Sequence, residues 1–363
     1  MSPPIPRIAR VPLTTKQPEA CPHCGGRNLT RRGTRRKKLE IVQLWRCSAC
    51  KRTFTPGPAA LHNKTYPLRV ILSAVTDYDL GYSLKQTAAR VNKKTGQHVS
   101  TSTLTAWLEQ YKNHCSYRRL RSRGLRHFPP QQTIRSIKLY HRQIYGYAFH
   151  RPKLEFLRVG SLDEKRAGDR HFGAVADFLD SIPTMCPHDL FRRDDDPKTR
   201  ASQATPVWAD ISRIIVNRKE NAATQAAALV IPAVGNNKLR HETLQRFMLC
   251  NDSVTVAIEI PIWLREHDIA ALEWQLGVEI TPRSTGTSRI ITGHLDFLQI
   301  RNGAVHILDY KPDASTNKPI AQLAIYALAL TRLVPGLRLF DIKCAWFNEH
   351  EYCEFFPRTL FAR

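Results

Sequence analysis

Apolar and polar positions alternate along the last third of the chain in a way that predicts a mixed α/β domain. Strands with a period of two are expected at 254–264, 289–300, 304–312, 340–347 and 351–356. Helices are expected at 237–249 and 319–333, the second after Pro319, a favourable first residue of a helix. The order helix, three strands, helix and strand indicates one compact α/β domain over residues 237–363.

The pattern in the amino-terminal half predicts a small helical unit. Three helices are expected at 67–80, 83–91 and 100–111, with Ser83 and Ser100 as N-caps. A helix, a short turn and a second helix are typical of a helix-turn-helix. In that arrangement Ser100, Thr101 and Thr103 would be available for DNA base edges. The alternative is a three-helix packing unit that recognises nothing.

Residues 128–236 give the weakest pattern and are interpreted as a helical connecting region. Helices are expected at 140–157, 171–179, 208–216 and 221–230, and a loop at 192–206. Cys186 and His188 stand two residues apart, but no second pair of metal ligands follows them in the sequence. We therefore expect no metal at that position.

Positive charge is concentrated in the amino-terminal part of the chain. The net charge is +24. Residues 1–153 hold 30 lysines and arginines against 5 acidic residues, whereas residues 154–363 hold 25 against 26. Such an imbalance favours a nucleic-acid partner, because each neutralised phosphate releases counterions. The expected DNA contacts are Arg31, Arg32, Arg35, Arg36, Lys37, Lys38, Arg118, Arg119, Arg121 and Arg123. A solvated charged face and an RNA partner remain alternatives.

Four cysteines near the amino terminus have the spacing of a metal site. Cys21 and Cys24 form one CxxC pair, and Cys47 and Cys50 form another. Two such pairs around a hairpin-length insert favour a structural Zn²⁺ ion in a zinc ribbon, with disulfides, a redox motif or iron as alternatives. The other five cysteines are scattered and no signal peptide is seen, which favours a reducing, intracellular (cytoplasmic, nucleoid-associated) location. No apolar run approaches the roughly 20 residues of a membrane span, so no membrane partner is expected.

The most informative segment carries two carboxylates and a lysine around an Asn-Gly turn. If Asn302 and Gly303 are the central residues of a type I′ turn, Asp296 lies directly opposite Asp309. Opposed like charges repel at about 5 Å, so a divalent metal between them is expected. Lys311 shares the face of Asp309, and His294 would lie opposite Lys311. The alternative is an amphipathic hairpin with solvated acids on its outer face.

This region resembles the PD-(D/E)XK nuclease superfamily, in particular its RecB-like branch. The resemblance rests on Gly293-His294-Leu295-Asp296, on Asp309-Tyr310-Lys311, and on Gln322 and Tyr326, which stand four residues apart. It implies that Asp296, Asp309 and the carbonyl of Tyr310 bind Mg²⁺ or Mn²⁺. It also implies that Lys311 holds the attacking water or the phosphate, and that Gln322 and Tyr326 line the site. His241 is the implied helical ligand, and Glu242 competes for that role.

Residues 20–112 resemble the DNA-binding regions of some transposases, through Leu44-Trp45-Arg46-Cys47 and Arg52-Thr53-Phe54. The expected domains are a zinc ribbon with a basic arm at 1–60, a helix-turn-helix at 61–127, the connecting region at 128–236 and the nuclease domain at 237–363. Together they predict a metal-dependent DNA endonuclease of mobile-element or defence context. It could act as a homodimer or with a transposition or defence partner. A TnsA-type end-cleaving subunit and a DNA-binding regulator with an inactive nuclease-like domain are the alternatives.

Overall fold

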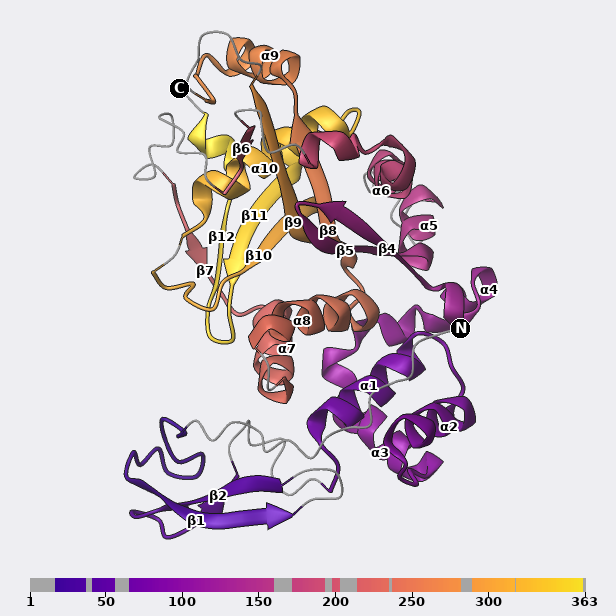
Figure 1. Cartoon of the computed structure of the whole chain (residues 1–363), viewed down its shortest axis with the longest axis vertical. Helices are drawn as coiled ribbons and strands as arrows, with labels where there is room; N and C mark the ends of the chain where they lie inside the picture. Colours follow the sequence, from indigo (N-terminus) through magenta and orange to yellow (C-terminus); the bar gives the residue numbers. More distant parts are fainter. Residues whose placement is uncertain are drawn as a thin grey trace. The chain divides into compact units, whose positions relative to one another are not determined.

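A computed structural model describes residues 17–36, 41–55, 65–159, 172–192, 198–202, 214–234, 237–281, 289–316 and 318–361 (Figure 1). The chain divides into two compact units. The first unit comprises residues 1–115 and 225–247, and the second unit comprises residues 116–224 and 248–363. The division falls within helix α8 (Asn237–Asn251), so the two units share that helix.

The first unit contains a three-stranded antiparallel sheet that holds the four amino-terminal cysteines. Its strands are β1 (Leu29–Arg36), β2 (Ile41–Cys47) and β3 (Thr53–Phe54), in the order β1-β2-β3. Leu29, Trp45 and Phe54 are buried beside the cysteines. The insert between the two cysteine pairs thus forms strands, as its length predicts. Lys37 and Lys38 lie outside the described residues.

The three expected helices are present as α1 (Leu68–Asp79), α2 (Leu84–Thr95) and α3 (Thr101–Gln110). Ser83 caps α2 by accepting a hydrogen bond from the amide of Gln86, and Ser100 caps α3 by accepting one from Thr103. The buried carboxylate of Asp77 on α1 is ion-paired with two cations of α2, Arg90 and Lys94. Helices α7 (Ala222–Val230) and α8 also confirm expected helices.

The second unit is built on one large mixed sheet. Its strands are β4 (Ile134–His141), β5 (Gln143–His150), β6 (Lys198–Arg200), β7 (Asn217–Arg218), β8 (Thr255–Leu264), β9 (Ile290–Arg301), β10 (Ala304–Tyr310), β11 (Ile342–Phe347) and β12 (Tyr352–Phe355). Eight of them follow the order β4-β5-β8-β9-β10-β11-β12-β7, and β6 pairs with β9. The pair β10–β11 is parallel, and α10 (Ile320–Leu333) connects these two strands.

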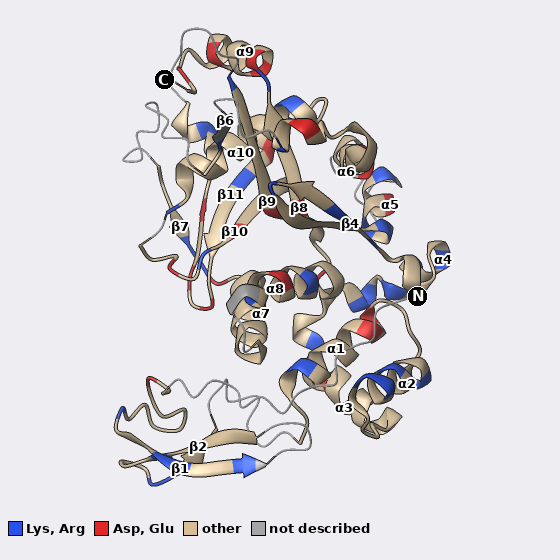
Figure 2. Cartoon of the chain, viewed as in Figure 1, with Lys and Arg blue, Asp and Glu red and all other residues tan. Residues whose placement is uncertain are grey.

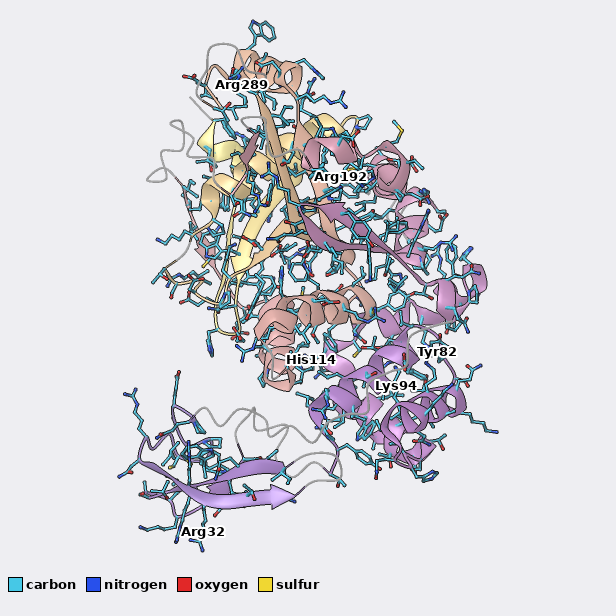
Figure 3. All side chains as sticks on the ribbon, in the orientation of Figure 1. Arg32, Tyr82, Lys94, His114, Arg192 and Arg289 are labelled. Carbon is cyan, nitrogen blue, oxygen red and sulfur yellow. The ribbon has the colours of Figure 1, made fainter. Side chains whose placement is uncertain are left out.

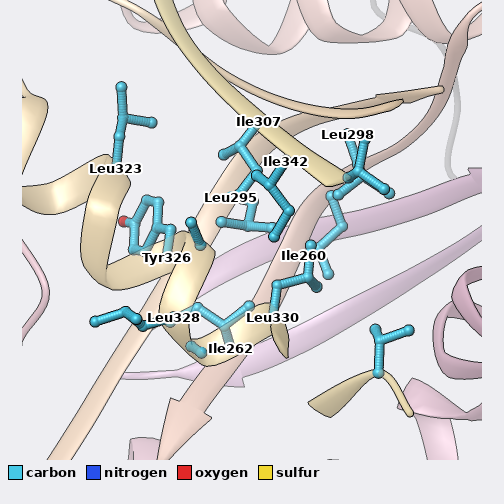
Figure 4. Close-up of a cluster of buried hydrophobic side chains, with 14 of the residues drawn as sticks. Ile260, Ile262, Leu295, Leu298, Ile307, Leu323, Tyr326, Leu328, Leu330 and Ile342 are labelled. Carbon is cyan, nitrogen blue, oxygen red and sulfur yellow. The ribbon is translucent and has the colours of Figure 1, made fainter. Parts of the chain in front are cut away.

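Helix α10 is buried along most of its length because it packs on the centre of this sheet. It contacts β8, β10 and β11, and Figure 4 shows Tyr326 and Leu330 among the buried side chains of those strands. The remaining helices of the second unit are α4 (Arg121–His127), α5 (Arg151–Val159), α6 (Gly173–Met185) and α9 (Glu266–Leu276), with short 3-10 turns η3 (Ser116–Arg119) and η5 (His188–Phe191). Helix α5 contacts β5, whereas α6 and α9 contact β8.

The connecting region differs from the sequence expectation. The helix expected at 140–157 is wrong over its first part, because β4 and β5 extend to His150 and only α5 is helical. At the end of β4, exposed and buried positions alternate with the period of two that is typical of a strand. This alternation covers only a few residues, so the sequence pattern did not reveal it. The loop expected at 192–206 is wrong at β6, which pairs with β9. The helical character of 171–179 and 221–230 is confirmed by α6 and α7, whereas most of the expected 208–216 helix lies outside the described residues.

Across the described part of the chain, no helix combines the length and the apolar character needed to cross a membrane.

Candidate active site

The expected hairpin forms with the expected register. Ala304 pairs with Arg301 and Leu308 pairs with Phe297, so the strand alignment places Asp309 opposite Asp296. Asn302 and Gly303 both have positive φ, at 51° and 66°, as a type I′ turn requires. The short turn therefore fixes which side chains face each other at the far end of the hairpin.

The two carboxyl groups are brought together in a largely buried position. Asp309 is only 4% exposed, and its carboxyl group shares a hydrogen bond with that of Asp296. Oδ2 of Asp309 lies 3.0 Å from Nζ of Lys311, and the amide of Tyr310 donates a hydrogen bond to Oδ2 of Asp296 at 3.1 Å. Four of the sequence-predicted site residues, Asp296, Asp309, Tyr310 and Lys311, thus form one connected group.

Burial and like charge dominate the electrostatics of this group. Burial, and then the negative charge of Asp296, hold the pKa of Asp309 well above its ordinary value, although Lys311 opposes them. Burial alone would lower the pKa of Lys311, but the two carboxylates raise it, so this side chain stays an ammonium at neutral pH. The two carboxyl groups are therefore held together at a cost that Lys311 offsets only in part.

Glu259 adds a third carboxylate that the sequence did not suggest. Ile258 pairs with Phe297 and Ile260 with Leu295, so Glu259 on β8 faces Asp296 on β9. A carboxylate oxygen of Glu259 and one of Asp296 lie within 4.8 Å of each other. Glu259 also has φ of 52°, in the left-handed region that a non-glycine residue enters at a cost. In the sequence, the one signal for this role of Glu259 is its position within the expected strand 254–264.

Gln322 and Tyr326 on α10 hold the strand that carries Asp296. Nε2 of Gln322 donates a hydrogen bond to Oη of Tyr326 at 2.9 Å, and that hydroxyl also bonds to the backbone of His294. Gly293 leaves the room for the tyrosine ring, because a Cβ at this position would lie 2.6 Å from Cε1 of Tyr326. Burial raises the pKa of Tyr326 far above its ordinary value, so the phenol stays protonated. This pair acts by positioning β9.

His294 is turned toward β4 and β5 in a way that the sequence did not indicate. Its ring stacks on Tyr145, with ring centroids 3.5 Å apart and planes at 7°. Nε2 of His294 lies 3.0 Å from Nδ1 of His141. The histidine therefore belongs to an aromatic cluster beside the carboxylates, although register alone placed it opposite Lys311.

The two candidate ligands on α8 lie in the first unit. Nε2 of His241 lies 3.4 Å from Nε2 of Gln245, one helical turn along. Glu242 is exposed. The carbonyl oxygen of Tyr310, another expected ligand, belongs to a residue that pairs with Phe347 in the parallel ladder. Their roles as ligands stay predictions.

The four amino-terminal cysteines come together as a group that could hold a metal ion. Sγ of Cys21 lies 3.7 Å from Sγ of Cys50, and Sγ of Cys24 lies 3.6 Å from Sγ of Cys47. Sulfur atoms about 2.3 Å from one tetrahedral zinc ion would be separated by nearly this distance, so the group fits zinc. Without an ion, the pKa values of two of these thiols move in opposite directions. The amides of Cys50 and Ala49 lower the pKa of Cys47 to about 7 despite its desolvation. The amide of Gly26 lowers the pKa of Cys24, but hydrogen bonds with Cys50 and Cys47 raise it to about 11.

The expected DNA-contacting residues differ in how far they are exposed to solvent. Arg31, Arg32 and Arg35 on β1 are exposed, and Arg32 projects from the sheet in Figure 3. Basic residues also mark α2 in Figure 2. By contrast, Arg123 on α4 stacks over Phe156, 5.0 Å from the ring centroid.

At the start of α3, the hydroxyl of Ser100 is committed to capping. Thr101 is exposed and Thr103 is half-buried, so Thr101 is the more accessible of the two for a partner. In the second basic cluster, Arg119 is exposed and Arg118 and Arg121 are half-buried. Nη2 of Arg119 donates a hydrogen bond to Oγ of Ser253 at 3.4 Å. That cluster therefore takes part in packing as well as offering charge.

Comparison with known proteins does not assign the chain to a family. No protein-family model matches the chain, and no curated protein or solved structure matches it significantly. The functional interpretation therefore depends on the chemistry of the described residues.

Proposed function

We propose that this chain is a metal-dependent DNA endonuclease whose carboxy-terminal domain belongs to the PD-(D/E)XK superfamily. The observation that carries the proposal is the group formed by Asp296, Asp309 and Lys311 at the end of the β9–β10 hairpin. Two carboxylates that could hold a divalent cation, with an ammonium beside them, are a set that can support phosphodiester hydrolysis. The order α8, β8, β9, β10, α10, β11 is also that of the superfamily core, with α9 inserted after β8.

The donor atoms fit a hard divalent cation. Asp296 and Asp309 would hold Mg²⁺ or Mn²⁺, and Glu259 supplies a further oxygen donor next to Asp296. Such a cation would supply Lewis-acid activation of the phosphodiester and of water. Lys311 keeps its proton and offers an N–H donor to a phosphate oxygen or to the attacking water. Gln322 and Tyr326 keep β9 in place through the contact with Gly293.

The amino-terminal modules would bring this site to DNA. The four cysteines fit a zinc ribbon, whose exposed arginines on β1 face solvent, and α3 offers the exposed Thr101 at its start as the recognition helix of a helix-turn-helix would. The concentration of positive charge before residue 154 supports a polyanionic partner. Tethering a nuclease domain to a DNA-binding module would raise its effective concentration at the target.

The deciding experiment is cleavage of supercoiled, linear and branched DNA by the full chain with Mg²⁺ or Mn²⁺. Asp309→Asn and Lys311→Ala are the test variants, and Asp177→Asn is the control, because Asp177 is an exposed acid paired with Arg158. We expect cutting by the wild type and the control, and a loss of roughly 1000-fold in both test variants, since a metal site contributes several kcal/mol. DNA binding without cutting under either metal would replace the proposal with a regulatory or assembly role.

The helical ligand is tested in the same assay. His241→Ala and Glu242→Ala separate the two candidates, because only the true ligand should change the metal concentration needed for half-maximal cutting. Equal curves for both variants and the wild type would remove α8 from the site. A shift confined to Glu242→Ala would favour the TnsA-type arrangement over the RecB-like one.

A further inference from the structure

A second cluster of metal-ligating side chains lies in the second unit, away from the amino-terminal cysteines. It comprises His141 at the end of β4, Cys186 immediately after α6, and His188 at the start of η5. One donor atom from each of the three residues lies within 4.8 Å of the other two. The sequence expectation of no metal here rested on Cys186 and His188 alone, and β4 supplies the missing donor.

The two imidazole rings already contact each other through their nitrogen atoms. Nε2 of His141 lies 2.8 Å from Nδ1 of His188, at hydrogen-bond distance, and one nitrogen of each ring lies within 4.8 Å of Sγ of Cys186. Two imidazole nitrogens on one tetrahedral zinc ion lie about 3.3 Å apart at bond lengths of about 2.0–2.1 Å. A small rotation of the half-buried His188 ring reaches that spacing.

The second nitrogen of His141 is held by an outer partner. Nδ1 of His141 lies 3.0 Å from Nε2 of His294, the arrangement in which a ligating histidine donates its other N–H to a neighbour. Phe191 stacks on the His141 ring, with centroids 4.1 Å apart and planes at 15°, and Tyr145 stacks on His294. These stacked aromatic rings fix the planes of both imidazoles.

We propose that His141, Cys186 and His188 form a second zinc site, with its fourth position open to water or another ligand. Two imidazoles and one thiolate suit zinc or another late transition metal, and they do not suit Mg²⁺. The ligands of this site differ in kind from the carboxylates of Asp296 and Asp309. The zinc-site proposal therefore does not depend on the proposed nuclease activity. Its outer partner His294 nevertheless lies two residues before Asp296 on β9.

Zinc content of the purified full chain tests the proposal. We expect about two zinc ions per chain, one for each cluster. Cys186→Ser and His188→Ala should each lower the content to about one. Cys353→Ser, a buried cysteine elsewhere in the sheet, and His267→Ala, an exposed histidine, should retain two. Far-UV circular dichroism checks that each variant is folded.

A variant with Cys24→Ser and Cys47→Ser isolates the second site. It should retain about one zinc ion, and Co²⁺ should give it a thiolate charge-transfer band that disappears when Cys186→Ser is added. A wild-type content of one ion that falls to zero in this variant would overturn the proposal. An ion that persists when Cys186→Ser and His188→Ala are added to the Cys24→Ser, Cys47→Ser variant would overturn it equally. The zinc content of the wild type decides even if one variant does not fold.

Discussion

The backbone amide of Tyr310 donates a hydrogen bond to Oδ2 of Asp296 across the β9–β10 hairpin, at 3.1 Å. One strand thus orients the acid of the other through its main chain, at the point where the regular ladder ends after Leu308 and Phe297. The contact therefore helps to hold the carboxyl group of Asp296 beside that of Asp309. Tyr310, which lies between Asp309 and Lys311 in the sequence, thus contributes to this group through its backbone amide.

Asp309→Asn should stabilise the metal-free protein while removing its response to metal. The substitution deletes one of two acids that are held together at a cost, and it keeps the size of the side chain. We expect a melting temperature equal to or above that of the wild type at pH 7 without metal. Added Mn²⁺ should raise the melting temperature of the wild type only, as measured by differential scanning fluorimetry. A variant that melts well below the wild type without metal would contradict this account.

The same carboxyl group predicts how stability changes with pH. Its pKa is raised in the folded chain, so the folded state binds more protons than the unfolded state above the ordinary value of 3.8. Stability without metal should therefore fall as pH rises from about 4 toward the raised pKa. The difference between wild type and Asp309→Asn in urea titrations isolates this contribution. A difference that is constant with pH would argue against a proton on Asp309.

Gly293→Ala should destabilise the second unit because its Cβ would meet the ring of Tyr326. Overpacking of this kind costs about 1–3 kcal/mol. Gly146→Ala is the matched control, since Gly146 also lies in a strand and a Cβ there would meet nothing within 4 Å. Urea denaturation gives the free energies of unfolding. Combining Gly293→Ala with Tyr326→Ala should make the two effects non-additive, and strict additivity would refute the contact.

Lys153→Met should reveal the role of a fully buried ammonium group. Nζ of Lys153 donates hydrogen bonds to the carbonyls of Leu249 and Thr255, both at 2.7 Å. The variant leaves these carbonyls without that donor, which costs about 1–3 kcal/mol each. We therefore expect a lower free energy of unfolding at pH 7. Arg151→Met, on the same helix and close to the surface, is the control.

Burial lowers the pKa of Lys153 to about 8, so the unfolded chain binds more protons than the folded chain between about pH 8 and 10.5. Wild-type stability should gain from this group as pH rises through that window, and Lys153→Met should lack the gain. Paired denaturation curves at pH 7.5 and 9.5 measure it. Parallel shifts of both proteins would contradict the titration of Lys153.

Removal of metal should unfold the cysteine-bearing sheet and leave the second unit folded. The buried residues beside the cysteines are few, so four thiolates without their ion cannot hold three short strands together. We expect amide exchange along β1 and β2 to accelerate on chelation, while that of β8 to β11 is unchanged. Cys24→Ser should have the same effect without a chelator. Protected β1 amides in the chelated protein would show that the sheet needs no metal.

The features that could be predicted from the sequence are those fixed by short-range chemistry. Asn302-Gly303 specifies one turn type, and the turn fixes the register that joins Asp296 to Asp309. Capping residues likewise marked the starts of α2 and α3. In each case the determining residues lie within a few positions of the feature.

The features that were missed depend on distant partners. Strand β5 pairs with β8 through Ala148 and Ile258. The residues near β5 in the sequence do not indicate which strand it pairs with. The same distance hides Glu259, whose place beside Asp296 follows from strand order. His141 joins Cys186 and His188 only because β4 ends beside η5. Sequence periodicity describes one segment at a time, so it cannot assemble such groups.

The pairing of β5 with β8 also sets the order in which parts of the chain can fold during synthesis. A ribosome has completed the cysteine-bearing sheet and helices α1 to α3 long before it makes Ile258, the partner of Ala148. Strands β4 and β5 must wait for that partner, and β10 must wait for β11, which follows α10. Long-range pairing of this kind is slow. The nascent chain would therefore form the cysteine-bearing sheet and helices α1 to α3 before it can pair β5 with β8 and β10 with β11.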